Sequence, residues 1–259
     1  MPFVELHDCR IHYSSSGATG APALLFSNSL GTTLSMWDPQ LSVFENHFRV
    51  LRCDTRGHGQ SSVTPGPYSI EQLAKDVLGL LDALHVDRVH FCGLSTGGMI
   101  GMWLGASAPE KLRKLVLCNT AAKIGTAETW NTRIATVRKS GMNSVASSVI
   151  ERWFSPAFRT EAPAELAKAR RMLETSNPEG YASACAAVRD FDQRETLSAI
   201  RVSTLVIAGA LDPVTPPSAG RFLAENIPGA QYTELSAAHL SNIEDRDRFN
   251  REVSAFLLA

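Results

Sequence analysis

Ser95 lies between Gly93 and Gly97 in the pattern G-x-S-x-G, which is typical of a serine that acts as a nucleophile. Residues 89–92 before it form an apolar run that favours a strand, and residues 98–108 after it favour a helix. A sharp turn between a strand and a helix holds a serine hydroxyl above the sheet, and the glycines let neighbouring backbone pack closely around it. The following helix N-terminus favours developing negative charge. We therefore expect Ser95 to attack a carbonyl carbon.

A serine nucleophile needs a general base that accepts its proton, and His239 has a suitable position for that role. When a serine occupies such a turn, the acid and then the histidine follow it along the chain. Of the seven histidines, only His239 comes after Ser95. It also follows residues 231–235, which favour a strand, so it belongs to a loop at a strand's carboxyl end. The order therefore predicts that His239 is the catalytic base.

The acid that orients the base must come between these two residues, at the end of another strand. Asp212 follows the strand-like residues 204–208, and a proline comes directly after it. Asp190 and Asp192 are the alternatives, but they precede that strand and would lie at its opposite end. We expect the Asp212 carboxylate to hold the imidazole in the productive tautomer and to stabilise the imidazolium.

Apolar runs alternate with helical patterns in the first and last parts of the chain. The expected strands are residues 23–26, 48–51, 89–92, 114–118, 204–208 and 231–235. One helix is marked by Ser69 and Gln72, which form a capping box, and by apolar residues that recur at helical spacing up to Leu84. Strands that alternate with helices of this length indicate crossover connections. The sequence therefore predicts an α/β fold with a mostly parallel central sheet flanked by helices.

Residues 122–190 interrupt this alternation, because they are rich in alanine and in long polar side chains and lack strand-like runs. Two proline-containing dipeptides, at residues 155–156 and 177–178, divide the segment into shorter helices. We therefore expect one α/β core formed by residues 1–121 and 191–259, with an inserted helical cap at residues 122–190.

The composition of the 259 residues fits one ordinary catalytic domain with an insertion. The formal net charge of −1 gives no reason to expect nucleic acid or an anionic membrane as a partner. No apolar run approaches the roughly 20 residues that a membrane span needs, and the N-terminus does not resemble a secretion signal. The five cysteines are scattered and include no CxxC pair. We expect a cytoplasmic protein that needs no metal or cofactor, and the sequence leaves its oligomeric state open.

The chain resembles the α/β-hydrolase fold family over essentially its whole length. Residues 27–31, 92–101 and 237–242 are similar to the 3-oxoadipate enol-lactonases, bacterial enzymes of the protocatechuate branch of aromatic degradation. The resemblance implies that a small anionic lactone is opened to 3-oxoadipate through a serine acyl-enzyme. Related esterases share parts of these stretches, so a general carboxylesterase or perhydrolase acting on neutral esters is the alternative.

The resemblance also implies an oxyanion hole formed by two backbone N–H groups. Thr96, the residue after the nucleophile, supplies one of them, and counting back from Trp37 assigns the other to Leu30. Asn28 and Ser29 stand where many relatives carry His-Gly. Backbone amides do not require those side chains, so the expected function survives the difference.

Residues 54–61 bring an aspartate, an arginine and a histidine close together, which suggests a second catalytic cluster. We interpret them instead as a turn after the strand at residues 48–51, with polar side chains that bond to loop backbone.

The charge of the expected cap fits an anionic substrate. Residues 122–190 contain ten Lys/Arg and seven Asp/Glu, a net charge of +3, whereas the whole chain carries −1. We expect Arg133 to bind the substrate carboxylate, because a guanidinium can form two parallel hydrogen bonds with it. Trp130 and Trp153 are the expected aromatic walls of the pocket.

Overall fold

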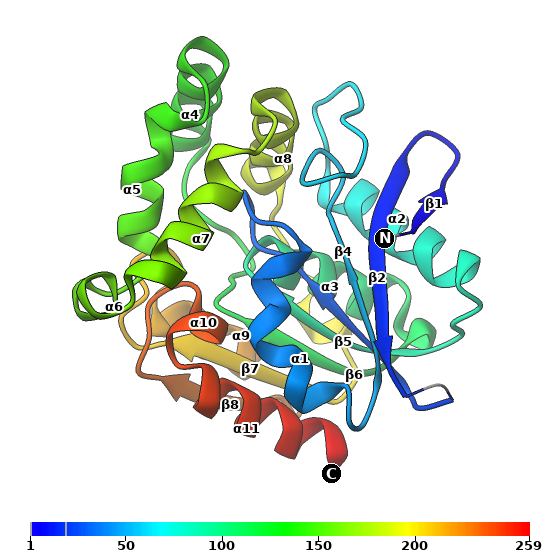
Figure 1. Cartoon of the computed structure of the whole chain (residues 1–259). Helices are drawn as coiled ribbons and strands as arrows, with labels where there is room; N and C mark the ends of the chain where they lie inside the picture. The colour runs from blue at the N-terminus through cyan, green and yellow to red at the C-terminus, as the bar shows by residue number, and fades with distance from the viewer. Residues whose placement is uncertain (1, 19) are drawn as a thin grey trace.

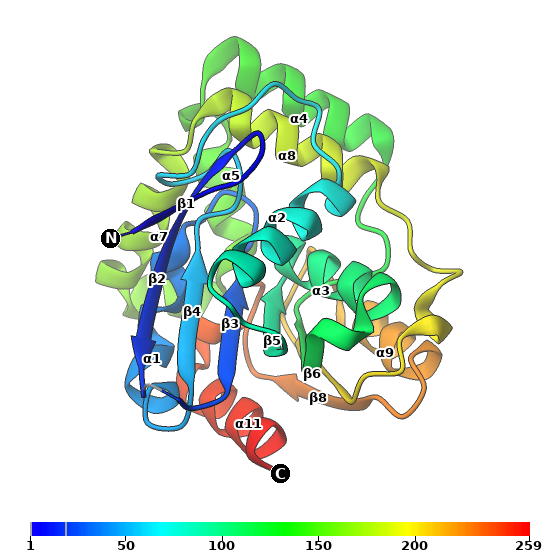
Figure 2. The same ribbon diagram turned by 90° about the vertical axis from the view of Figure 1, so that its right-hand side faces the viewer.

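A central sheet of eight strands crosses the molecule, and helices cover both of its faces (Figures 1 and 2). The computed structural model describes residues 2–18 and 20–259. The strands are β1 (Phe3–Glu5), β2 (Arg10–Gly17), β3 (Ala23–Ser27), β4 (Arg49–Cys53), β5 (Val89–Leu94), β6 (Leu112–Cys118), β7 (Thr204–Gly209) and β8 (Gln231–Leu235). Their order is β1-β2-β4-β3-β5-β6-β7-β8; β2 is antiparallel to both neighbours, and the other pairs are parallel. The predicted α/β fold is confirmed.

All six predicted strands are present, and the two that the sequence does not predict are β1 and β2. Strands β3, β5 and β7 are buried along their whole length, so their sequences read as continuous apolar runs. Strand β2 instead ends in the polar residues Ser14, Ser15 and Ser16, and β1 has only three residues. Neither has the apolar pattern from which a buried strand is recognised.

The helices of the core form two layers. Helices α1 (Asp38–Phe44) and α11 (Arg246–Leu258) pack together on one face of the sheet, whereas α2 (Ile70–Ala83), α3 (Thr96–Ser107) and α9 (Pro217–Asn226) cover the other (Figures 1 and 2). The short helices η1 (Leu34–Trp37), η2 (Pro109–Lys111), η3 (Leu197–Ala199) and α10 (Ser241–Glu244) lie in the connections. Among the described residues, no helix is long and apolar enough to cross a membrane.

Five helices lie between β6 and β7 in the sequence and gather at the end of the sheet where the parallel strands have their carboxyl ends (Figures 1 and 2). They are α4 (Ala127–Ser140), α5 (Asn143–Trp153), α6 (Pro156–Glu161), α7 (Pro163–Glu174) and α8 (Pro178–Asp190). The two expected breaks are helix starts: Ser155 and Asn177 cap α6 and α8 with their side chains, and each helix then begins with proline. We call α4 to α8 the cap helices.

Residues 54–61 form the polar turn that the sequence predicts. The Asp54 carboxylate accepts hydrogen bonds from the N–H groups of Leu34 (2.8 Å) and Gln60 (2.9 Å), so it joins two loops. The buried Arg56 donates to Asp76 in α2 and to Asp8 in the β1–β2 connection, each at 2.8 Å. The interpretation of this stretch as structural is therefore confirmed.

The ion pairs of the buried Arg56 predict that Arg56→Met lowers the free energy of unfolding much more than Lys75→Met, although both substitutions remove an ion pair that involves α2. Arg56→Met leaves the mostly buried Asp76 carboxylate without its partner, which should lower the free energy of unfolding by about 3–5 kcal/mol. Lys75→Met removes an exposed pair with Glu71 one turn away, which should cost about 0.5 kcal/mol at most. Urea unfolding of both variants measures the difference. Equal losses of free energy of unfolding would contradict the structural role of the Arg56–Asp76 pair.

Candidate active site

Ser95 occupies a strained turn between β5 and α3. Its φ of 58° is in the left-handed region, which non-glycine residues rarely adopt. The turn is tight on both sides: a Cβ atom on Gly93 would lie 2.2 Å from the Gly97 carbonyl oxygen, and one on Gly97 would lie 2.2 Å from that of Ser27. The Ser95 N–H donates to the Cys118 carbonyl at 2.9 Å, which ties the turn to β6. Both glycines flanking Ser95 are therefore required by close backbone contacts.

His239 and Asp212 form a buried hydrogen-bonded pair. The His239 Nδ1 atom lies 2.8 Å from Asp212 Oδ2, and the side chains are almost inaccessible to solvent. The other Asp212 oxygen accepts the N–H groups of Val214 (2.7 Å) and Thr215 (3.1 Å), and the Thr215 hydroxyl donates to Oδ2 at 2.7 Å. Burial works to raise the pKa of Asp212, but the charge of His239 and these hydrogen bonds outweigh it and lower that pKa. The carboxylate is therefore charged at neutral pH.

The two alternative acids lie elsewhere. Asp190 pairs with its neighbour Arg189 at the end of α8. Asp192 pairs with Lys123 and Arg194 at the surface. The carboxylate that bonds to the histidine is therefore that of Asp212, as the strand order predicts.

A cavity of about 180 Å³ lies between the core and the cap helices. Ser95 and His239 line this cavity. So do the residues expected in the oxyanion hole and the substrate pocket, which are Leu30, Thr96, Trp130, Arg133 and Trp153. The structure thus brings these predicted residues together, with Asp212 bonded to the far side of the imidazole. Three residues that the sequence analysis missed also line the cavity: Arg152, Tyr181 and Val214.

Two arginines give the cavity a concentrated positive charge. The Arg133 guanidinium carbon lies 4.9 Å from the centroid of the Trp130 ring, which fixes its place on the wall. Within residues 2–18 and 20–259, neither Arg133 nor Arg152 forms an ion pair with a carboxylate. Burial, and then the charge of Arg133, lowers the pKa of Arg152. The cavity therefore holds two half-buried cations without a protein counter-ion.

The two tryptophans belong to rigid walls. Trp130 donates its indole N–H to the Ile124 carbonyl at 2.7 Å. The Trp153 carbonyl accepts the N–H of Leu240, the residue after His239, at 3.0 Å. The second bond joins α5 of the cap directly to the loop that carries the histidine.

The loop between β3 and η1 contacts the turn of Ser95. The Asn28 carbonyl accepts the Gly97 N–H at 2.9 Å, and the Asn28 side chain accepts the Trp37 indole N–H at 3.0 Å. Gly31, at φ 78°, donates its N–H to His58 Nε2 at 3.1 Å. Within the described part of the chain, the N–H groups of Leu30 and Thr96 donate to no other residue. Both amides are therefore available to a ligand in the cavity.

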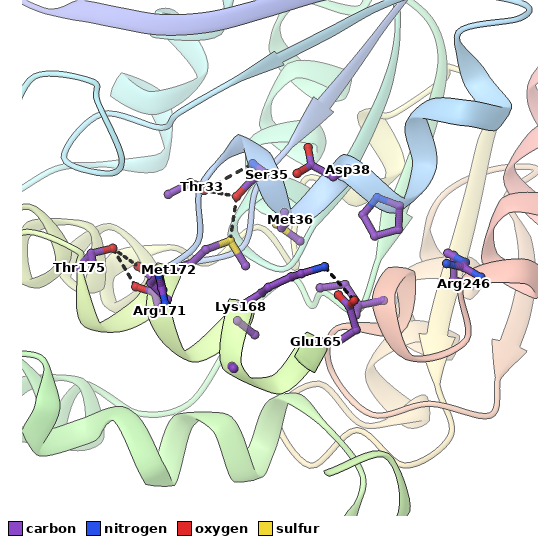
Figure 3. Close-up of a pocket in the computed structure, with 14 residues that line it drawn as sticks. Thr33, Ser35, Met36, Asp38, Glu165, Lys168, Arg171, Met172, Thr175 and Arg246 are labelled. Carbon is purple, nitrogen blue, oxygen red and sulfur yellow. Dashed lines mark hydrogen bonds and ion pairs between the residues drawn. The ribbon is translucent and has the colours of Figure 1, made fainter. Parts of the chain in front are cut away.

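A larger hollow of about 740 Å³ lies between α7 and the segment from Thr33 to Pro39 (Figure 3). The Ser35 hydroxyl lies 3.3 Å from the Met172 sulfur across it, and Lys168 pairs with Glu165 along α7 (Figure 3). None of the three expected catalytic residues lines this hollow. The smaller cavity is the candidate active site, because it alone combines the nucleophile with the histidine among the pockets of the described residues.

The fold agrees with the comparisons with known proteins. The family described as alpha/beta hydrolase fold matches residues 22–246, and the chain belongs to this family. The chain is 44% identical over 250 residues to 3-oxoadipate enol-lactonase 2 from Acinetobacter baylyi, covering 96% of this chain and 94% of that protein.

Solved structures extend the comparison. The enol-lactonase from Burkholderia xenovorans LB400 has a TM-score of 0.98 and 45% identity, with 100% of both chains covered. A malate-bound thermophilic esterase from Thermogutta terrifontis has a TM-score of 0.93 and 28% identity, covering 99% of this chain and 98% of that one.

The buried ring of His58 should make the stability of the protein depend on pH. Burial lowers its pKa, and its Nε2 atom accepts the Gly31 N–H, so the folded protein holds the neutral ring. Below about pH 6.5 the unfolded histidine takes up a proton that folded His58 does not, so stability falls as pH falls towards the lowered pKa. His58→Gln should therefore make the free energy of unfolding less dependent on pH below about pH 6.5. Urea unfolding across this range tests it, and identical slopes would reject the role of His58.

Proposed function

We propose that the protein hydrolyses 3-oxoadipate enol-lactone to 3-oxoadipate through an acyl-enzyme on Ser95, in the degradation of aromatic compounds. The observation that carries this proposal is the pair of uncompensated arginines, Arg133 and Arg152, in the cavity of Ser95 and His239. A neutral ester cannot compensate the charge of these two half-buried cations, whereas a lactone with a carboxylate substituent can. The enol-lactonases among the relatives support the same substrate.

Acylation begins at the hydroxyl of Ser95. In the neutral imidazole of His239, an Nδ1–H that donates to Asp212 leaves Nε2 as the acceptor, and this atom takes the Ser95 proton as the serine oxygen attacks the lactone carbonyl. The carbonyl oxygen becomes negative, and the free N–H groups of Leu30 and Thr96 stabilise it. Asp212 stabilises the imidazolium that forms.

Ring opening follows when the tetrahedral intermediate collapses. The bond between the carbonyl carbon and the ring oxygen breaks, and the imidazolium of His239 returns its proton to that oxygen. The leaving group is an enol, which remains tethered to the acyl chain and converts to the ketone. Because the ketone is a poor nucleophile, this conversion opposes reclosure of the ring.

Deacylation uses the same groups with water as the nucleophile. His239 accepts a proton from water, the hydroxide attacks the acyl carbon, and Ser95 leaves with that proton. The product, 3-oxoadipate, carries a second carboxylate that the reaction has created.

The cap helices supply the substrate-binding groups in this proposal. Arg133 and Arg152 hold the carboxylate, and Trp130 and Trp153 form the walls beside the ring. We propose that residues 122–190 act as a cap domain on a core of residues 1–121 and 191–259. A reducing cytoplasm suits the five cysteines, which are all free and buried.

Ser95→Ala tests the nucleophile. Without the hydroxyl no acyl-enzyme forms, so kcat for the enol-lactone should fall by at least about 10⁴-fold. The matched control is Ser35→Ala, which removes a hydroxyl from the larger hollow and should leave kcat near the wild-type value. Steady-state assays of purified protein measure both, and undiminished hydrolysis by Ser95→Ala would place the reaction at another site.

Arg133→Met and Arg152→Met test the anionic substrate. Each should lower kcat/KM for the enol-lactone by about 10- to 100-fold, because a charged hydrogen bond to the carboxylate is lost. Hydrolysis of p-nitrophenyl acetate, which has no carboxylate, should change little.

Arg138→Met is the control for these variants, because Arg138 lies on α4 but pairs with Glu179 at the surface. Equal losses on both substrates in the Arg133 and Arg152 variants would favour the alternative, a general esterase acting on neutral esters.

A further inference from the structure

Asn119, the residue directly after β6, has an unusual backbone and is completely enclosed. Its φ of 44° is left-handed, and only 1% of its surface is exposed. Asparagine tolerates this conformation better than most other non-glycine residues. Its N–H donates to the Ile207 carbonyl at 2.8 Å and thus still belongs to the pairing with β7. The side chain of Asn119 is therefore held in a fixed place at the carboxyl end of the sheet.

The Asn119 side chain contacts the acid of the proposed catalytic triad and the residue that precedes its histidine. Its Nδ2 atom donates to Asp212 Oδ2 at 3.1 Å and to the carbonyl of Ala238, the residue before His239, at 3.0 Å. Its Oδ1 atom accepts the hydroxyl of Ser241 at 2.6 Å. A flipped amide would place three oxygen acceptors together, so these contacts fix the direction of the donor.

The position of this amide determines how two separate loops meet. Asp212 lies after β7 and His239 lies after β8, so their 2.8 Å hydrogen bond depends on the relative placement of both loops. The NH₂ group of Asn119, directly after β6, bonds to both loops, through Asp212 in one and the Ala238 carbonyl in the other. Gly209 leaves room for this arrangement, because a Cβ atom there would lie 2.8 Å from Asn119 Nδ2 and 2.4 Å from the Ala238 carbonyl oxygen.

The residues beside Asn119 contact the nucleophile. The Cys118 carbonyl accepts the Ser95 N–H at 2.9 Å, and the Thr120 hydroxyl donates to the Ser95 carbonyl at 2.8 Å. Three consecutive residues at the end of β6 thus bond to the segments that carry the serine, the acid and the histidine.

We propose that Asn119 is a positioning residue of the hydrolytic site, which holds the Asp212 carboxylate and the His239 loop in register through one amide. This inference rests on the proposed serine hydrolysis. Ser241 acts through Asn119 by fixing the direction of its amide.

Asn119→Gly is the decisive variant, because glycine adopts a φ of 44° without strain and removes only the side chain. A positioning role predicts that kcat falls by about 10- to 100-fold on both the enol-lactone and p-nitrophenyl acetate, while KM stays within about twofold. The Asp212 carboxylate loses one donor and then stabilises the imidazolium more strongly, so the acid limb of the kcat/KM profile moves to higher pH. Ser241→Ala should produce a smaller loss of kcat in the same direction.

Asn250→Ala is the matched control, since it also removes a buried asparagine side chain, but from α11 and a contact with Gln40. It should lower the urea midpoint without moving the pH profile. Wild-type kcat and an unmoved acid limb in Asn119→Gly would overturn the positioning role. If the wild-type protein hydrolyses the ester but not the lactone, the proposed substrate is wrong. The effect of Asn119→Gly would then still be measured on the ester.

Discussion

The left-handed backbone of Ser95 is the constraint on which the other parts of the site depend. A non-glycine residue in such a conformation costs on the order of 1–3 kcal/mol, so surrounding contacts must hold it. They come from two directions: the Cys118 carbonyl accepts the Ser95 N–H, and the Asn28 carbonyl accepts the Gly97 N–H. Because Gly93 has no side chain, the turn closes tightly. The contacts that hold the strained serine therefore also bring the end of β6 and the β3–η1 loop to it.

The charges of the site are compensated in two different ways. Asp212 is buried, and its oxygens accept hydrogen bonds from His239, Asn119, Thr215 and the Val214 N–H, so its negative charge is satisfied inside the protein. The guanidinium groups of the cavity are half-buried and have no carboxylate partner among the described residues. A buried charge is stable only when it is paired. The charge of Asp212 is thus compensated within the protein, whereas in the proposed function the carboxylate of the substrate would compensate the two arginines.

The sequence predicts the fold and the central chemistry because both depend on local patterns. Buried parallel strands such as β5 read as apolar runs, and chain order alone selects His239 and Asp212 as partners of Ser95. Arg152 and Asn119 are different, because their roles come from contacts with residues far away in the chain. Ten cationic residues occupy positions 122–190, and nothing local distinguishes Arg152, which lines the cavity, from those at the surface. An asparagine after a strand likewise gives no sign that two loops from β7 and β8 converge on it.

The cap helices contact both catalytic loops, so binding and chemistry share one framework. A Cβ atom on Gly31, the residue after Leu30, would lie 2.7 Å from Leu173 of α7 and 3.0 Å from Tyr181 of α8. On the other side, the Glu244 carboxylate accepts the N–H groups of Ala238 and of Ser155, which caps α6. A shift of the cap helices would therefore disturb the loops of Leu30 and His239, the proposed oxyanion donor and base, together. The helices in these contacts, α6 to α8, pack beside α4 and α5, which carry Arg133 and Arg152, so the proposed binding of the carboxylate and the proposed attack on the carbonyl would share one packed framework.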